Sequence, residues 1–123
     1  MAHGRAMRIR AMFDAYLAND RAAVEGLLSD DFRFTSPYDH ELDRASYFAR
    51  CWRDDNGWIA RHQLERIMVE GDAAYVIYLC VARDGASFRN TELMLFAGDK
   101  VRRIDVYFGA SYRDGVFRKQ AGA

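Results

Sequence analysis

The sequence predicts one α+β domain spanning residues 1–123, with N-terminal helices packed on an antiparallel sheet. Two observations lead to this prediction. Up to residue 52 the apolar residues recur mostly at helical spacing, and from residue 58 they alternate with polar residues between turn signals. A chain of 123 residues is also long enough to bury a core without disulfides or metal ions.

The first segment carries an apolar stripe at positions i, i+3, i+4, i+7 and i+8, which predicts an amphipathic helix. The stripe consists of Ile9, Met12, Phe13, Tyr16 and Leu17. The stretch "AND" at 18–20 interrupts the pattern, and Asp20 is placed to cap a second, short helix. The buried side of that helix is expected to comprise Ala23, Val24, Leu27 and Leu28.

Between residues 32 and 52 the period of the pattern changes twice. Phe32, Phe34 and Ser36 alternate with polar residues, which predicts a short strand that ends at Pro37. Asp43 suits the N-cap of a third helix. The buried stripe of this helix is expected to hold Phe48, Cys51 and Trp52. The sequence "DDNG" at 54–57 has turn chemistry and is expected to end the helix.

The second half predicts four strands joined by tight turns, an antiparallel meander. The turns are expected at "EGD", at "RDG" (83–85) and at "AGDK". The strands are expected at Trp58–Glu70, Ala73–Ala82, Ser87–Phe96 and Val101–Phe108. The polar tail from Ser111 is expected to fray or to pair weakly.

Composition and motifs exclude several function classes. Eighteen basic and eighteen acidic residues balance, so no field attracts nucleic acid or an anionic membrane. Three scattered histidines and the absence of phosphate-binding glycine motifs predict no metal and no cofactor. Cys51 and Cys80 are far apart, which indicates reduced, buried thiols. With no signal peptide or membrane-spanning stretch, a cytoplasmic location is expected.

The strand Tyr75–Val81 is apolar on both of its faces. A strand in an antiparallel sheet usually has one face in water, and the helices can cover only one side of a single sheet. We therefore expect a homodimer in which two sheets pack face to face. Asp105 and Tyr107 alternate with Val106 and Phe108, so they are assigned to this interface.

The order of these elements resembles a known superfamily. Two helices, the stretch "DRAAVEGLLSDDFRFTSP", a third helix and a meander closing in "VYFG" are similar to the nuclear transport factor 2-like superfamily, and within it to the SnoaL-like proteins. The resemblance covers roughly residues 5 to 110. It implies a cone-shaped, cystatin-like roll, in which helices lie over the concave face of a strongly curved sheet and enclose an apolar pocket.

The resemblance also implies where a ligand would lie. The loop "SPYDHEL" would form the rim of the cone, with Tyr38, Asp39 and His40 between water and the cavity. Aromatic residues would line the wall: Phe13, Tyr16, Phe34, Phe48, Trp52 and Phe108. For each aromatic residue the alternative is an ordinary place in the core.

Ketosteroid isomerases of this fold offer a comparison by residue. They use an acid just before the proline of the first strand, where this chain has Ser36. They use a tyrosine of the first helix, where this chain has Met12, with Tyr16 one turn further on. Their second, protonated acid lies on the meander, and Glu92 matches that place. One match of three argues against isomerase activity of that kind.

Glu92 is the strongest catalytic candidate on physical grounds. It alternates with Phe88, Asn90, Met94 and Phe96, so Asn90 is expected to face the ligand beside it. If that face is concave, burial among apolar groups raises the pKa of the carboxyl and makes it a proton donor or base near neutral pH. The alternative is a cross-strand ion pair between Glu92 and an arginine, Arg61 or Arg103.

SnoaL-like cyclases and related hydrolases use a catalytic aspartate, sometimes with a histidine. Asp39, His40 and Asp43 supply these residue types here. An imidazole beside a carboxylate can transfer protons at neutral pH. The alternative places Asp39 in a turn, Asp43 at a helix cap and His40 in solvent. His62 could reach the cavity or could be a hydrogen-bonded histidine of the sheet.

Two functional readings follow. In the first, the chain is a SnoaL-like pocket protein for a small apolar molecule, with Glu92, Asp39 and His40 as candidates for cofactor-independent isomerase, cyclase or hydrolase chemistry. In the second, it is a non-catalytic binding or dimerisation module. The surroundings of Glu92 distinguish them: an open carboxyl favours the first reading and a tight arginine partner the second. A protein adaptor is the weaker third reading, because the predicted loops are short.

Overall fold

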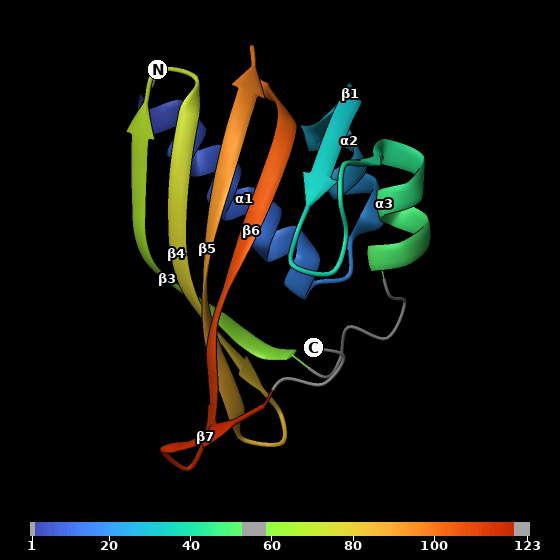
Figure 1. Cartoon of the computed structure of the whole chain (residues 1–123). Helices are drawn as coiled ribbons and strands as arrows, with labels where there is room; N and C mark the ends of the chain where they lie inside the picture. Colours follow the sequence, from blue (N-terminus) through green and yellow to red (C-terminus); the bar gives the residue numbers. More distant parts are fainter. Residues whose placement is uncertain (1, 53–58, 120–123) are drawn as a thin grey trace.

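The computed structural model describes residues 2–52 and 59–119, which form three helices and seven strands (Figure 1). The helices are α1 (Ala2–Leu17), α2 (Arg21–Leu27) and α3 (Arg44–Cys51). The strands are β1 (Leu28–Thr35), β2 (Leu42–Asp43), β3 (Ile59–Glu70), β4 (Ala73–Ala82), β5 (Ala86–Ala97), β6 (Lys100–Arg113) and β7 (Val116–Arg118).

Both predicted helix caps are confirmed. The Asp20 side chain accepts a hydrogen bond from the Ala23 backbone at 3.2 Å, and Asp43 accepts one from the Ser46 backbone at 2.8 Å. The buried side predicted for the second helix is partly wrong, because Ala23 is exposed and Leu28 belongs to β1. Leu28 is nevertheless buried, since the chain turns directly from α2 into the sheet.

The predicted meander is confirmed, with β3, β4, β5 and β6 as consecutive antiparallel neighbours. Gly71, Gly85 and Gly98 adopt positive φ values of 57°, 90° and 62° in its three turns. Because L side chains rarely take this conformation, glycine allows each turn to be tight. Trp58 and the "DDNG" segment at 54–57 lie outside the described residues.

The sheet is mixed, which corrects the expectation of a wholly antiparallel one. Its order is β2-β1-β6-β5-β4-β3, with β7 on β6, and β1 runs parallel to β6. Phe34 is paired with Ile104 in this parallel segment. The two strands lie far apart in the sequence, and a local alternation pattern carries no information about the direction of such a distant partner.

The C-terminal tail also differs from its prediction. The segment from Ser111 was expected to fray or pair weakly, but β6 continues to Arg113 and turns back into β7. Ser111 is buried, and the rings of Tyr112 and Phe117 meet at 6.4 Å across the hairpin. Gly115, with φ of 77°, makes the turn possible.

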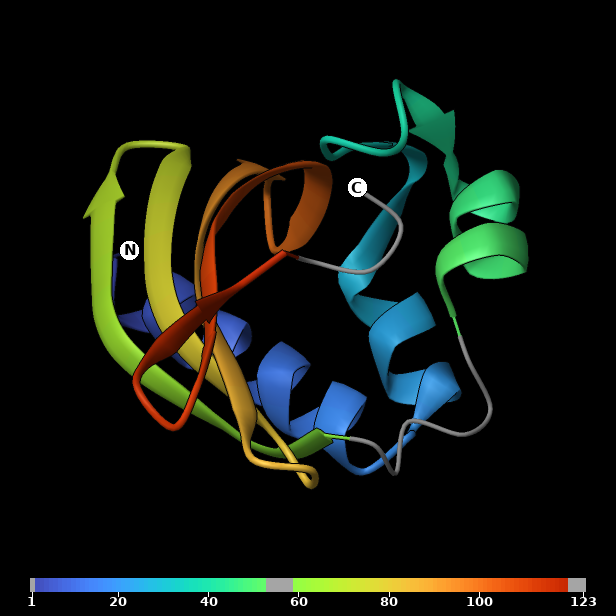
Figure 2. The ribbon, with the colours of Figure 1, turned by 60° about the horizontal axis from the view of Figure 1, so that its bottom comes forward.

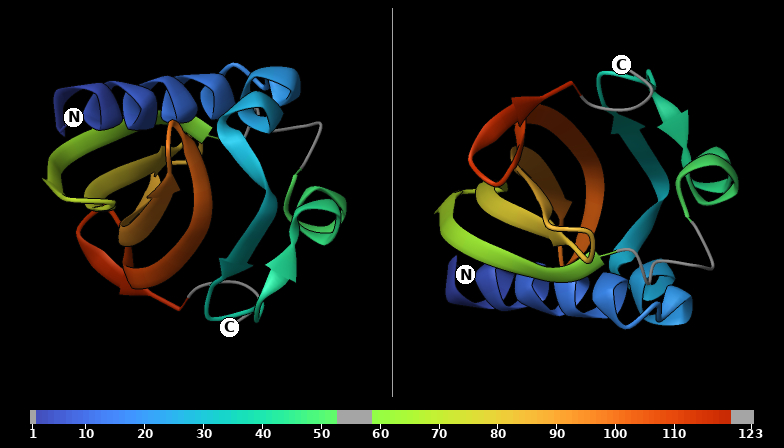
Figure 3. Two further views of the ribbon diagram at one scale, coloured as in Figure 1. Left: turned by 90° about the horizontal axis from the view of Figure 1, so that it is seen from above. Right: turned by 90° about the horizontal axis from the view of Figure 1, so that it is seen from below.

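The long strands bend strongly, so the sheet curls around the core and remains open (Figures 2 and 3). Register shifts in the β3–β4 and β5–β6 pairs mark bulges, which increase local bending and twist. Helix α1 lies along the concave side, where Ile9, Met12 and Phe13 are buried. Leu17 ends the predicted stripe but is 40% exposed, because it lies at the end of the helix.

The convex face of the sheet has no helix over it (Figure 1). In β4 the side chains of Ala74, Val76, Tyr78 and Cys80 are buried on the concave side, whereas Tyr75 on the convex side is 45% exposed. None of the helices in the described part of the chain is long and apolar enough to span a bilayer.

Candidate functional site

The concave face is organised in rungs, because residues paired across an antiparallel sheet point to the same side. Three rungs cross β4, β5 and β6, and each contributes side chains to the interior. They are Val76–Glu92–Val106, Tyr78–Asn90–Phe108 and Cys80–Phe88–Ser111. A polar group therefore stands in the middle of the first two rungs.

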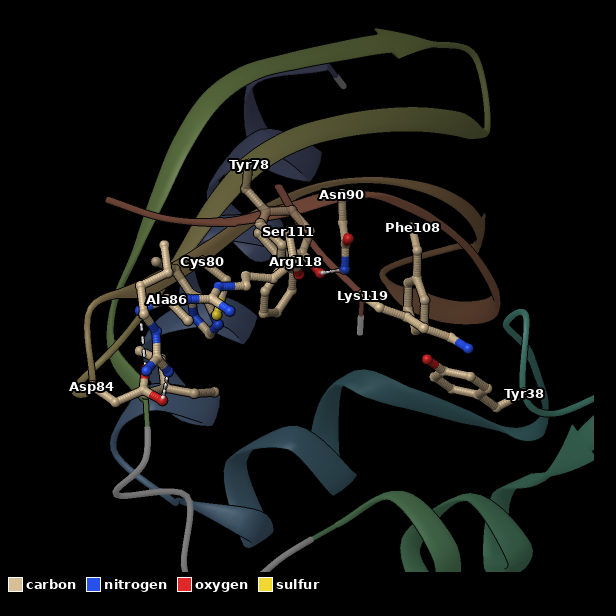
Figure 4. Close-up of a pocket in the computed structure, with 15 residues that line it drawn as sticks. Tyr38, Tyr78, Cys80, Asp84, Ala86, Asn90, Phe108, Ser111, Arg118 and Lys119 are labelled. Atoms are coloured by element: carbon tan, nitrogen blue, oxygen red, sulfur yellow. Dashed lines mark hydrogen bonds and ion pairs between the residues drawn. The ribbon is translucent and has the colours of Figure 1, made fainter. Parts of the chain in front are cut away.

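Two connected chambers open on these rungs. The inner chamber is bounded by α1, β1 and the first two rungs, and it has a volume of about 320 Å³. The outer chamber has a volume of about 840 Å³. The chambers share six lining residues, so they form one continuous hollow, and Figure 4 shows the outer part of it. The shared residues are Tyr38, Ile59, His62, Tyr78, Asn90 and Phe108.

Glu92 lies in the wall of the inner chamber, on β5. Its carboxylate Oε2 accepts a hydrogen bond of 2.6 Å from the Tyr78 hydroxyl. Burial raises the pKa of Glu92 from 4.5 to about 7, and the hydrogen bond from Tyr78 offsets part of that rise. The carboxyl is therefore poised between its acid and base forms near neutral pH.

The arginine partners considered for Glu92 are engaged elsewhere. Arg103 forms ion pairs with Glu41 at 2.7 Å and with Asp105 at 3.2 Å. Arg61 is paired with Val81 on the convex side of the sheet and is exposed. Among the described residues no lysine or arginine forms an ion pair with Glu92.

A chain of hydrogen bonds fixes the Tyr78 hydroxyl. The Gly109 backbone N–H donates to Asn90 Oδ1 at 3.4 Å, which orients the Asn90 amide. Asn90 Nδ2 then donates to the Tyr78 oxygen at 3.1 Å, and Tyr78 directs its proton to Glu92. Burial raises the pKa of Tyr78 well above its usual value, so this hydroxyl remains a donor.

Two further polar residues face the inner chamber near Glu92. Burial, and next the charge of Glu92, raise the pKa of Tyr16 well above its usual value, so Tyr16 keeps its proton. Burial lowers the pKa of His62, which favours the neutral imidazole. The His62 ring lies edge-on to Phe13 and Tyr78, and its buried Nδ1 has no hydrogen-bond partner among the described residues.

The acids and histidine of the rim loop are not brought together at the chamber. Asp39 lines the inner chamber, but its carboxylate pairs with Arg50 at 3.0 Å and accepts a weak hydrogen bond from Cys51 Sγ at 3.8 Å. His40 is exposed and lies outside both chamber linings. Asp43 serves as the cap of α3.

The aromatic residues expected to line the wall separate into two groups. Phe13, Tyr16 and Phe34 line the inner chamber, while Tyr38 and Phe108, whose rings meet at 5.0 Å, border both chambers. Two others lie behind this lining in the core, where their rings are 6.1 Å apart. These are Phe48 and Trp52.

Tyr78 is the site residue that sequence reasoning did not single out, whereas His62 takes the first of its two predicted places and reaches the chamber. Tyr78 stands in an almost wholly apolar strand, where nothing local distinguishes it from the residues around it. The available signal was register: once the β4–β5 turn is placed, Tyr78 pairs with Asn90, one rung from Glu92.

The cysteines of the site are not suited to nucleophilic catalysis, and the His, Cys, Asp and Glu side chains that the structure describes are not arranged around a metal ion. Burial raises the pKa of both Cys51 and Cys80 to about 11, with Asp39 adding to the effect at Cys51, so neither is a thiolate nucleophile. Within the described residues no three His, Cys, Asp or Glu side chains gather as they would around a metal ion. The arrangement suits proton transfer on a molecule enclosed by apolar walls.

The comparisons with known proteins agree with this architecture. The model of the SnoaL-like domain matches residues 9–104. An NTF-2 like protein of unknown function from Burkholderia xenovorans LB400 superposes with a TM-score of 0.71 at 19% identity, over 98% of this chain and 89% of that one. A search of curated proteins gave no match.

Two other solved structures carry functional descriptions. AclR from Streptomyces galilaeus, described as a proposed hydroxylase, has a TM-score of 0.75 at 17% identity, with 89% of this chain and 91% of that one covered. A proposed SnoaL-like polyketide cyclase from Jannaschia sp. CCS1 has a TM-score of 0.73 at 14% identity, covering 86% and 85%. At these identities the likeness establishes the fold. Because the family model spans most of the chain, this protein belongs to the SnoaL-like domain family.

Proposed function

We propose that this SnoaL-like protein binds a small apolar molecule, cyclic or aromatic, in the inner chamber and catalyses proton transfer on it without a cofactor. The observation that carries the proposal is the Glu92 carboxyl, which faces a largely apolar chamber and is held by a tyrosine hydroxyl instead of a cation. The proposed polyketide cyclase among the structural neighbours is in keeping with a ligand of this kind.

The proposed chemistry uses both forms of Glu92. The ionised carboxylate takes a proton from a carbon next to a ligand carbonyl, and the electron pair of the broken C–H bond moves into the carbonyl to form an enolate. Tyr16, which keeps its proton, would donate a hydrogen bond to the enolate oxygen. The Glu92 acid then returns the proton to another carbon, or to an alkoxide formed when the enolate closes a ring.

Asp39 and His40 receive smaller parts in this proposal. Asp39 is paired with Arg50, so its place is at the rim, where it would orient a polar edge of the ligand. His40 is exposed and is assigned no contact with a ligand inside the chamber. His62, with a neutral ring in both chamber walls, is the better candidate to accept a hydrogen bond from a ligand hydroxyl.

Exchange of carbon-bound hydrogen tests the proposal. In D₂O, the protein is expected to accelerate deuterium exchange at the methyl group of 2-acetylnaphthalene, an aromatic ketone, as followed by proton NMR. Glu92→Gln keeps an acceptor for Tyr78 but cannot take a proton, so the rate should fall about 100-fold or more. The wild-type rate should rise with pH through about 7, as Glu92 ionises.

Binding of the same ketone, measured by calorimetry, separates the two readings of the fold. Tight binding with no exchange above the buffer rate would contradict the enzymatic proposal and favour a non-catalytic binding module. Equal exchange rates for the wild type and Glu92→Gln would remove Glu92 from the chemistry. Glu70→Gln, at the exposed end of β3, is the matched control and should exchange at the wild-type rate.

We also propose that two copies of the chain pack through the convex faces of their sheets, in a reducing, cytoplasmic setting. The convex face carries large apolar side chains that nothing in the described chain covers, including Met68, Tyr75 and Tyr107, which are 52%, 45% and 59% exposed. Such a contiguous face is typical of an interface. Asp105 lies at the polar margin of this face, paired with Arg103.

Sedimentation velocity is expected to give a dimer for the wild type and a monomer for Tyr75→Glu, because a buried carboxylate in an apolar interface is strongly unfavourable. Val116→Glu changes an apolar residue on β7 that is 60% exposed and lies away from this face, and this variant should remain dimeric. A monomeric wild type at high protein concentration, or a dimer that tolerates Tyr75→Glu, would contradict the proposal.

A further inference from the structure

The outer chamber differs from the inner one in its charge. Its lining includes Asp84, Arg113, Arg118 and Lys119. Arg113 Nη2 lies 2.5 Å from Asp84 Oδ2, so these two charges neutralise each other. Arg118 and Lys119 form no ion pair within the described residues, and they leave two positive charges beside the hollow.

Figure 4 shows how these cations lie. The side chains of Arg118 and Lys119 extend over the same hollow as Asn90 and Phe108. Asp84 lies to one side of them and Tyr38 to the other. The two cations therefore approach the path of a ligand that enters the inner chamber past Tyr38 and Phe108.

Strand register gives the distance along the sheet between the rung of Arg118 and the rung of Glu92. Arg118 is paired with Ser111, and Ser111 with Phe88, and all three line the outer chamber. Phe88 precedes Glu92 by four residues on β5. Since a strand rises about 3.3 Å per residue, roughly 13 Å separate the two rungs.

The surface between these two ends carries no ionised group on the rungs. Asn90 and Ser111 are neutral, Phe88 and Phe108 are apolar, and burial raises the pKa of the Cys80 thiol to about 11. A ligand lying along the hollow would thus meet an acid at one end, an uncharged surface over its length and cations at the other end.

We propose that the ligand is an elongated amphipathic acid, with its apolar body in the inner chamber and its anionic group bound by Arg118 and Lys119 in the outer chamber. The apolar part of this statement rests on the function proposed above, whereas the anionic part rests on the outer chamber alone. Arginine suits the role because its planar guanidinium donates two parallel hydrogen bonds to a carboxylate. The two cations and Glu92 also determine which way round the ligand binds, since its anionic group would be repelled by the Glu92 carboxylate.

A pair of ligands with the same chain tests this inference by calorimetry at low salt. Decanoate is expected to bind the wild type about tenfold more tightly than decan-1-ol, because contacts with two solvent-exposed cations contribute a few-fold each. Arg118→Glu with Lys119→Glu should abolish or reverse this preference and leave the affinity for decan-1-ol unchanged. Added salt should weaken only the binding of decanoate.

Arg10→Glu with Arg102→Glu is the matched control, because it changes the net charge equally at exposed positions outside both chambers. It should retain the preference for decanoate. If both ligands bind the wild type equally, or if the control loses the preference to the same extent, the anionic subsite is refuted while the apolar pocket stands. If neither decanoate nor decan-1-ol binds, both the apolar pocket of the proposed function and the present inference are contradicted.

Discussion

Glu92→Gln is expected to make the protein about 3 kcal/mol more stable than the wild type at about pH 8, while the two remain similar at about pH 4. The reason is the pKa of Glu92, which burial raises from 4.5 to about 7. Each tenfold change in proton affinity corresponds to about 1.4 kcal/mol. Chemical denaturation at a series of pH values measures the difference.

The sign of this stability difference depends on whether the folded or the unfolded state binds the Glu92 proton more tightly. Between pH 4.5 and about 7 the folded protein keeps the Glu92 proton and the unfolded chain releases it. Folding is therefore favoured less as the pH rises, and the wild type loses this stability progressively until Glu92 ionises in the folded state. Glutamine does not titrate, and it can still accept the hydrogen bond from Tyr78.

Comparing the wild type with Glu92→Gln separates the contribution of Glu92 to stability from that of the other groups that titrate in this pH range. His62 has a lowered pKa and contributes a loss of stability at low pH, but it does so equally in both proteins. Glu70→Gln, at an exposed position, should follow the wild-type curve. Parallel curves for the wild type and Glu92→Gln would show that the carboxyl is not desolvated.

Gly109→Ala is expected to destabilise the protein by about 3 kcal/mol, because the new methyl group collides with backbone. A Cβ at this position would lie 2.0 Å from the Arg89 carbonyl oxygen and 3.0 Å from its carbon. The close approach arises at the bulge where the β5–β6 register shifts between Phe88 and Asn90. Thermal and denaturant unfolding measure the change.

The same substitution should also disturb the site, since the Gly109 backbone N–H orients Asn90 and through it Tyr78. Gly26→Ala is the control: it lies in α2, its added Cβ meets nothing within 4 Å, and alanine favours the helix by about 1 kcal/mol. The bulge would have no structural role if Gly109→Ala were as stable as Gly26→Ala.

Much of the fold can be predicted from local sequence patterns, because helix caps and strand alternation depend on residues that are close together in the sequence. The caps at Asp20 and Asp43 were recognisable since a short acidic side chain before a helix satisfies free backbone N–H groups. The alternation around Glu92 indicated its face, since a strand has a period of two. The resemblance to SnoaL-like proteins then supplied the curvature and the pocket.

The remainder depends on contacts between distant segments, which local patterns do not encode. The parallel pairing of β1 with β6 is one case, and the continuation of the sheet past Ser111 is another. The place of Phe48 behind the chamber wall depends on how α3 packs, and no spacing within α3 distinguishes the core from the pocket. The pairing of Asp39 with Arg50, likewise, joins a loop to a helix.

The proposed chemistry depends on a Glu92 carboxyl that the Tyr78 hydroxyl holds in a largely apolar chamber. A ¹³C NMR titration of the glutamate side-chain carboxyl carbons measures the pKa of this carboxyl, with the Glu92 signal assigned by its absence in Glu92→Gln. We expect a titration midpoint near 7 for Glu92. A midpoint near 4.5, the ordinary value for a glutamate in water, would contradict it.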